Sequence, residues 1–140
     1  MKWSRRNLPF LLPALAAAQT SGGSGPLSSR ATRYQDLQPR KNGPMVSRQI
    51  LSGDTHTGYH IDLHETEIAA GDAPHAPHSH VHEEMLLVRE GLLDVTIDGH
   101  TTPVGPGSVA YVASGQMHGW RNAGTTQARY FVVALGDDKA

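Results

Sequence analysis

The 140-residue chain contains no cysteine, which excludes disulfide bonds, thiolate metal sites and cysteine nucleophiles. Its length suits one domain. Its formal net charge of −1, without a clustered Lys/Arg stripe, predicts no nucleic-acid partner. Fifteen glycines, nine prolines and only 6% aromatic residues favour short strands joined by turns. A transition metal in this chain would have to be held by imidazole and carboxylate groups.

Residues 1–18 are predicted to be a signal peptide. "MKWSRRNLPFLLPALAAAQ" has a basic start, an apolar run from Leu8 to Ala18 and a small-residue step at its end. A membrane-spanning helix needs about 20 apolar residues, so we expect no stable membrane anchor after cleavage. "SRRNL" is similar to the twin-arginine export signal; an ordinary secretory signal with a chance Arg-Arg pair is the alternative. Both predict a periplasmic or secreted protein.

Residues 19–44 are predicted to be a flexible spacer and N-terminal arm, because "TSGGSGPLSS" (residues 20–29) has the composition of a flexible linker. The folded domain is predicted to span residues 45–140. No helical periodicity is evident there, and "YHIDLHETEI" alternates as a strand does, with Ile61 and Leu63 on one face and His60, Asp62 and His64 on the other. The polar face can line a pocket mouth or face solvent.

Turn signals recur through this domain, at Glu90-Gly91, Asp98-Gly99, Gly105–Gly107 and Ser114-Gly115. The runs between them, such as Leu92–Ile97 and Ala128–Leu135, are rich in β-branched and apolar residues. Short alternating strands between regularly spaced turns predict an all-β sandwich or barrel.

The segment "PHAPHSHVHEE" (residues 74–84) places four histidines directly before two glutamates. In an extended segment, side chains of equal parity point the same way. The candidates that share one face are His78, His80, His82 and Glu84. His75 and Glu83 have the opposite parity and are weaker candidates. The sequence pattern does not separate the pair His78/His80 from His80/His82, and a solvated histidine-rich loop without metal is the alternative.

Two segments resemble the paired motifs of the cupin superfamily. "GDAPHAPHSHVHEEMLLVREG" is similar to the first motif and "GSVAYVASGQMHGWRN" to the second. The matching positions are Gly71, His78, His80, Glu84 and Gly91, followed by Gly107, Gly115, His118 and Asn122. Two departures occur: Ala113 stands where the second motif usually has proline, and the spacer before His78 is one residue longer than usual. The resemblance covers residues 71–122.

The resemblance implies a double-stranded β-helix, or jelly-roll barrel, that commonly forms a homodimer. It also implies a metal site at His78, His80, Glu84 and His118, which leaves two adjacent positions open on a six-coordinate ion. Such ligands suit several divalent transition metals. If the twin-arginine route exports the protein already folded and metal-loaded, Mn or Fe is favoured, with Zn, Ni or Cu as alternatives.

A metal centre with open positions predicts an enzyme of the dioxygenase, isomerase or decarboxylase type acting on a small molecule. The alternative is a non-catalytic cupin module that binds a small molecule or the metal. No catalytic acid or base is assigned. Four further residues, Tyr111, Met117, Trp120 and Tyr130, can wall a substrate cavity or serve core or dimer packing. Asn122 is predicted to stabilise a turn.

Overall fold

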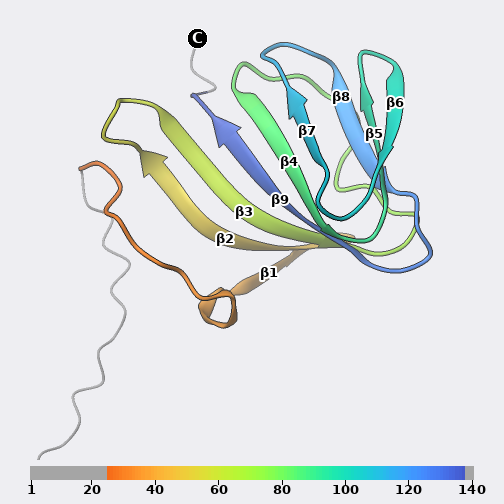
Figure 1. Cartoon of the computed structure of the whole chain (residues 1–140), viewed down its shortest axis with the longest axis horizontal. Coiled ribbons are helices and arrows are strands. Elements are labelled where there is room, and N and C mark those ends of the chain that lie inside the picture. The colour runs from red at the N-terminus through yellow and green to blue at the C-terminus, as the bar shows by residue number, and fades with distance from the viewer. Residues whose placement is uncertain (1–24, 138–140) are drawn as a thin grey trace, which may run out of the picture.

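The computed structural model describes residues 25–137, so the expected signal peptide at residues 1–18 lies outside the described residues. The described chain consists of short strands and one 3₁₀ helix (Figure 1). Their bounds are η1 (Tyr34–Asp36), β1 (Pro39–Asn42), β2 (Met45–Asp54), β3 (His60–Ile68), β4 (Glu83–Glu90), β5 (Leu93–Ile97), β6 (His100–Val104), β7 (Val109–Val112), β8 (His118–Asn122) and β9 (Ala128–Leu135). Residues 25–137 contain no helix long and apolar enough to cross a membrane.

The strands form two antiparallel sheets. The larger has the order β1-β2-β3-β9-β4-β7 and the smaller has the order β6-β5-β8. Alternate residues of both sheets point inward and form one core. Its buried apolar members are Ile68, Leu86, Val88, Leu93, Val95, Trp120, Ala128, Tyr130 and Val132. The predicted all-β jelly-roll barrel is confirmed.

Two of the predicted turns show why glycine is needed there. Asp98 and Gly99, between β5 and β6, both have positive φ angles (46° and 82°), as a two-residue type I′ hairpin turn requires. Gly91, which follows β4, has a φ of 85°, and a Cβ atom at this position would lie 2.7 Å from the Cα atom of Ala128. Gly91 therefore allows β4 to end directly against β9.

Part of the segment predicted as the N-terminal arm lies against the barrel. β1 pairs with β2, and the backbone N–H of Leu27 donates a hydrogen bond of 2.8 Å to the carbonyl oxygen of Asp54. These contacts extend the large sheet to residue 39, before the predicted start of the domain at Met45.

A charged cluster fixes η1 to the outer side of the large sheet. Glu65 on β3 is fully buried and pairs with Arg48 at 3.3 Å and with Arg89 at 2.9 Å. The ring of Tyr34 lies 5.3 Å from the guanidinium carbon of Arg48 and 4.8 Å from that of Arg89. The sequence pattern did not predict this cluster, because its members come from four separate segments.

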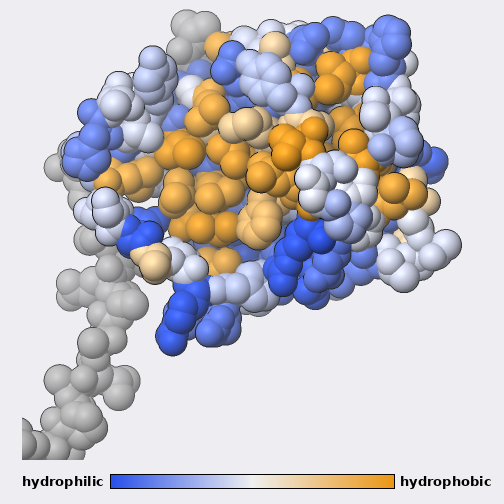
Figure 2. Space-filling model, in the orientation of Figure 1, coloured by the Kyte–Doolittle hydropathy of each residue, from blue (hydrophilic) through white to orange (hydrophobic). Residues whose placement is uncertain are grey.

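Apolar side chains also lie on the outside of the barrel. Leu87 on β4 pairs in register with Val109 on β7, and Met85 pairs with Tyr111. The exposed fractions of Leu87, Val109 and Tyr111 are 37%, 57% and 51%. Figure 2 shows a broad apolar area over the strands of the large sheet. Tyr111 therefore does not wall the barrel interior.

Candidate metal centre

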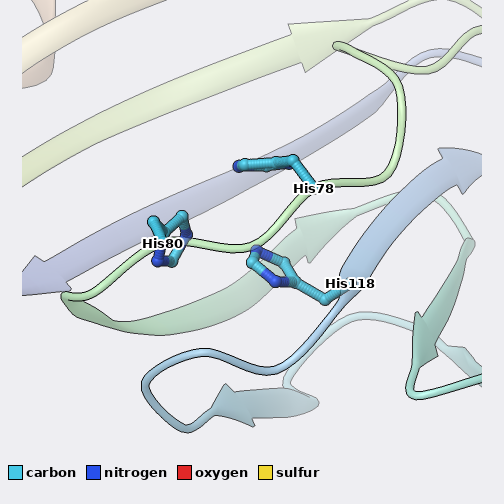
Figure 3. Close-up of side chains that lie close together, drawn as sticks. All are labelled: His78, His80 and His118. Atoms are coloured by element: carbon cyan, nitrogen blue, oxygen red, sulfur yellow. The ribbon is translucent and has the colours of Figure 1, made fainter.

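The three histidines that the resemblance to cupins implied as ligands come together from two separate segments. His78 and His80 lie on the loop before β4, and His118 is the first residue of β8 (Figure 3). The backbones of His78 and His118 exchange two N–H···O hydrogen bonds of 2.9 Å, which tie the loop to the small sheet. As a result, one ligand atom from each of the three imidazoles lies within 4.8 Å of the others.

Glu84 on β4 approaches two of these histidines, although its ligand atom is grouped within 4.8 Å with those of His80 and His82 and not with those of His78 and His118. Its Oε2 atom lies 3.2 Å from Nε2 of His80, and its Oε1 atom lies 3.9 Å from Nε2 of His118. The side chain is buried because Glu84 is paired with Ala134 of β9 on one side and with Val112 of β7 on the other. The large sheet thus carries the carboxylate, and the small sheet carries His118.

Backbone carbonyls set the tautomers of two histidines. Nδ1–H of His80 donates to the carbonyl oxygen of His82 at 2.8 Å, and Nδ1–H of His118 donates to that of Gln116 at 2.9 Å. A carbonyl oxygen only accepts, so Nδ1 must carry the proton in both rings. In the neutral ring the lone pair is then on Nε2, which is the atom turned toward Glu84.

The donor set fits a metal ion, because its atoms are buried and unsatisfied. Eight buried side-chain nitrogen and oxygen atoms make no hydrogen bond within residues 25–137. Two of them, Glu67 Oε2 and Arg129 Nε, form an ion pair with each other at 2.9 Å. Four of the remaining atoms belong to the four predicted ligands, one atom from each: His78 Nδ1, His80 Nε2, Glu84 Oε1 and His118 Nε2. Buried polar atoms normally have partners, and imidazole with carboxylate suits a divalent transition metal.

The surroundings keep His78 in the neutral form that binds metals. Burial is the main cause that lowers the pKa of His78 below its ordinary value, and the neighbouring His75, His118 and His80 lower it further, whereas Glu84 opposes them. His75 contacts the ring of His78 edge-on, with 4.3 Å between the ring centroids.

His82, one of the candidates on the predicted ligand face, lies close to the centre. Its ring stacks on that of His80 with 3.6 Å between centroids, and its Nε2 lies 3.7 Å from Oε2 of Glu84. His80, His82 and Glu84 therefore form a second group with ligand atoms within 4.8 Å of one another. Glu83 points the other way, where its hydrogen bond with Tyr111 raises the pKa of that tyrosine.

The polar face of β3 lies on the same side of the large sheet as Glu84. Asp62 is paired with Ala134, which is in turn paired with Glu84. Nδ1 of His64 lies 3.0 Å from Oδ1 of Asp62, and both side chains are half-buried. His60 on this face is half-buried as well, and none of the three side chains is among the lining residues of the cavity described below.

A cavity of about 590 Å³ has His82 among its lining residues but none of the four predicted ligands. Thr55, Tyr59, Val81, His82 and Leu135 are among its lining residues. His82 therefore contacts the cavity and also lies close to Glu84.

Comparisons with known proteins agree with this architecture. A family model described as a cupin domain matches residues 61–134. No curated protein matches the chain. Among solved structures, an RmlC-like cupin from Shewanella frigidimarina NCIMB 400 has a TM-score of 0.66 at 17% identity, over 80% of this chain and 95% of its own.

Two further solved structures carry enzyme names. The polyketide cyclase RemF from Streptomyces resistomycificus has a TM-score of 0.64 at 23% identity, over 79% of this chain and 81% of its own. A predicted oxalate decarboxylase from Thermotoga maritima has a TM-score of 0.66 at 15% identity, over 77% of this chain and all of its own. At these identities the likeness shows a common fold.

Proposed function

This chain belongs to the cupin domain family, and we propose that it is a metal-dependent enzyme acting on a small molecule. The proposed centre consists of His78, His80, Glu84 and His118, and the reaction is of the dioxygenase, isomerase or decarboxylase type. The observation that carries this proposal is the set of four buried ligand atoms, one from each of these residues, that make no hydrogen bond within residues 25–137. A cluster that served only to stabilise the barrel would be expected to satisfy its own polar atoms.

The roles of the chain's own groups follow from the geometry. A bound ion would supply a Lewis acid that polarises an oxygen of the substrate. The carbonyls of His82 and Gln116 hold the imidazoles of His80 and His118 in the metal-binding tautomer. The half-buried pair of Asp62 and His64, on the same side of the sheet as Glu84, is one titratable pair that could take part in proton transfer, and the pair of His60 and Asp54 is another.

The alternative is a non-catalytic module that binds the metal or a small molecule. It is favoured by the cavity of about 590 Å³ that His82 lines, because the surface of this cavity is mainly apolar and suits binding more directly than acid–base chemistry. Turnover that a chelator abolishes would support the enzyme. Saturable ligand binding without turnover would support the module.

The proposed location is the periplasm or the exterior of the cell, and the proposed metal is Mn or Fe. Both rest on "SRRNL" near the start of the chain. A protein that folds before export acquires its metal before Zn and Cu, the stronger binders, can compete in the envelope. Protein purified from the native envelope should therefore contain Mn or Fe, and a finding of only Zn or Cu would contradict this part of the proposal.

Elemental analysis of that protein tests the centre itself. We expect about one ion per chain, and its loss in a His78→Ala/His80→Ala variant, because two of three imidazole ligands are removed. His56→Ala/His100→Ala is the matched control, since both of these histidines are exposed and outside the ligand groups. Absence of a stoichiometric metal from the parent protein would disprove the enzyme as proposed.

We propose that the outer face of β4 and β7 joins two copies of the chain. Leu87, Val109 and Tyr111 are exposed there and adjacent in register. Arg89 and Glu90 at the end of β4 give this face a positive and a negative charge. In a dimer with twofold symmetry the same face of both copies meets, so opposite charges of the two copies can pair.

Light scattering of the purified protein should give the mass of two chains. A Leu87→Lys/Val109→Lys variant should give the mass of one, because two buried charges would face each other across the interface. Met117→Lys, at another exposed apolar residue, should leave the dimer intact. A monomeric parent protein, or a dimeric double variant, would refute this interface.

A further inference from the structure

The side chain of His82 lies close to two of the predicted metal ligands. Its Nε2 atom is 3.7 Å from Oε2 of Glu84, and Nε2 of His80 is 3.2 Å from the same oxygen. Metal–ligand bonds of about 2.1 Å place neighbouring ligand atoms of one ion about 3.0 to 3.4 Å apart. These atoms of His80, His82 and Glu84 are therefore nearly as close together as ligands that share one ion.

Stacking holds the ring of His82 in this position. The rings of His80 and His82 are nearly parallel, at 12°, with 3.6 Å between their centroids. Both rings turn Nε2 toward Glu84. The backbone carbonyl of His82 also accepts the hydrogen bond from Nδ1–H of His80. His82 thus orients His80 through its backbone and adds a second imidazole nitrogen through its side chain.

The contact between His80 and Glu84 needs a positive charge between the two groups. Because Nδ1 of His80 carries the proton, the neutral ring directs the lone pair of Nε2 toward the carboxylate. This Nε2 atom is buried and makes no hydrogen bond within residues 25–137. A nitrogen lone pair and a carboxylate oxygen repel each other at 3.2 Å, whereas both bind a metal cation that lies between them.

The centre contains two overlapping groups of ligand atoms. One group consists of His78, His80 and His118, and the other consists of His80, His82 and Glu84. Within each group the ligand atoms lie within 4.8 Å of one another. His80 belongs to both groups, and with a proton on Nδ1 it offers only Nε2 to a metal. The two groups therefore cannot both use His80 for separate ions at the same time.

The two groups differ in the ions that suit them. Zn is normally four-coordinate, so three imidazoles and one further ligand satisfy it. Mn takes six ligands and is suited by carboxylate oxygen, and two histidines with one carboxylate are a typical ligand set for Fe(II). We therefore expect Mn and Fe to use the group that contains His82, and Zn to depend on the three histidines of the other group.

We propose that His82 is a fifth metal-binding residue of this centre, which binds Mn or Fe together with His80 and Glu84 but is not needed for Zn. This inference rests on the proposed metal centre and adds one residue to it. The ring of His82 then has two roles, since it stacks on His80 and also supplies a ligand nitrogen.

Titration with Mn(II) and, separately, with Zn(II) against a competing chelator tests the role of His82. His82→Phe keeps a ring that can stack on His80 but has no ligand nitrogen, and His82→Ala removes the ring. Both should weaken Mn binding by about tenfold or more, because loss of a residue that only supports a ligand already has an effect of this size. Zn binding should be unchanged, which also shows that the variants are folded.

His75→Ala is the matched control for these variants. His75 lies in the same loop before β4 and contacts His78, but it belongs to neither group of ligand atoms. This variant should bind Mn and Zn as the parent protein does. If it lost Mn binding as His82→Phe does, the effect would belong to the loop and not to a ligand nitrogen, and the inference would be overturned.

The remaining outcomes separate this inference from the proposed function. Parental Mn affinity in His82→Phe would show that the ring acts only by stacking and would overturn the inference alone. Equal loss of Mn and Zn binding in His82→Phe would contradict the separate use of His82 by Mn. A parent protein that binds neither ion would disprove the proposed centre and, with it, the role of His82.

Discussion

A His118→Ala variant is expected to lose most of the stability that a bound metal ion gives the protein. His118 has an exposed fraction of 1%, and its Nδ1 is held by the carbonyl of Gln116, so its Nε2 is fixed in place before any ion binds. A ligand that binds only the folded state adds about 4 kcal/mol at a concentration a thousand times its Kd. Mutating a residue that only supports a metal ligand can weaken metal binding by up to about a hundredfold. If loss of His118 weakens binding by this factor, the metal stabilises the folded variant by only about 1.4 kcal/mol.

Denaturant unfolding with and without metal measures this difference for the parent protein and for the variant. His100→Ala, at an exposed position, should retain the full stabilisation. Equal stabilisation of the parent protein and His118→Ala would remove His118 from the ligand set and leave the group of His80, His82 and Glu84 as the alternative centre.

Asn122→Ala is expected to lower the free energy of unfolding by about 3 kcal/mol, because several hydrogen bonds are lost inside the protein. The Nδ2 atom of Asn122 donates to the carbonyl oxygens of Ile68 and Thr126, and its Oδ1 atom accepts from the N–H of Gly124. The side chain is fully buried and joins β3, β8 and the turn before β9. This agrees with the prediction that Asn122 stabilises a turn.

Urea unfolding of Asn122→Ala, beside Asn42→Ala as the matched control, tests the prediction. Asn42 is exposed on β1 and should change the free energy of unfolding by no more than about 0.5 kcal/mol. If both variants unfold alike, the amide of Asn122 does not hold these segments together.

Local sequence features were sufficient for the all-β class, whereas the jelly-roll barrel was implied by the resemblance to the cupin superfamily. Strand alternation has a period of two residues, and a two-residue turn with positive φ angles needs particular residues, so Asp98 and Gly99 identified a hairpin without any information on distant contacts. The start of the sheet could not be predicted from the sequence. All residues of β1 are exposed, so it has no apolar pattern of its own, and it is a strand because it pairs with β2.

Parity was less informative in the loop that carries the histidines. Side chains alternate between two faces only where the backbone is extended, but β4 begins only at Glu83, and the backbone from His78 to His82 is irregular. His82 consequently stacks on His80 and does not take up a separate position along one face. The ligand set of His78, His80, Glu84 and His118 stays a prediction that metal analysis must test.

The sequence by itself determined the all-β class, the positions of the main turns and a set of candidate ligands, because each of these follows from residues within a short segment. Only the tertiary structure decided which distant residues meet. The approach of Trp120 to Tyr130 and of Glu65 to its two arginines depends on strand register and sheet order. Pairing between strands far apart in the chain depends on packing of the whole core, so one short segment of sequence does not reveal it.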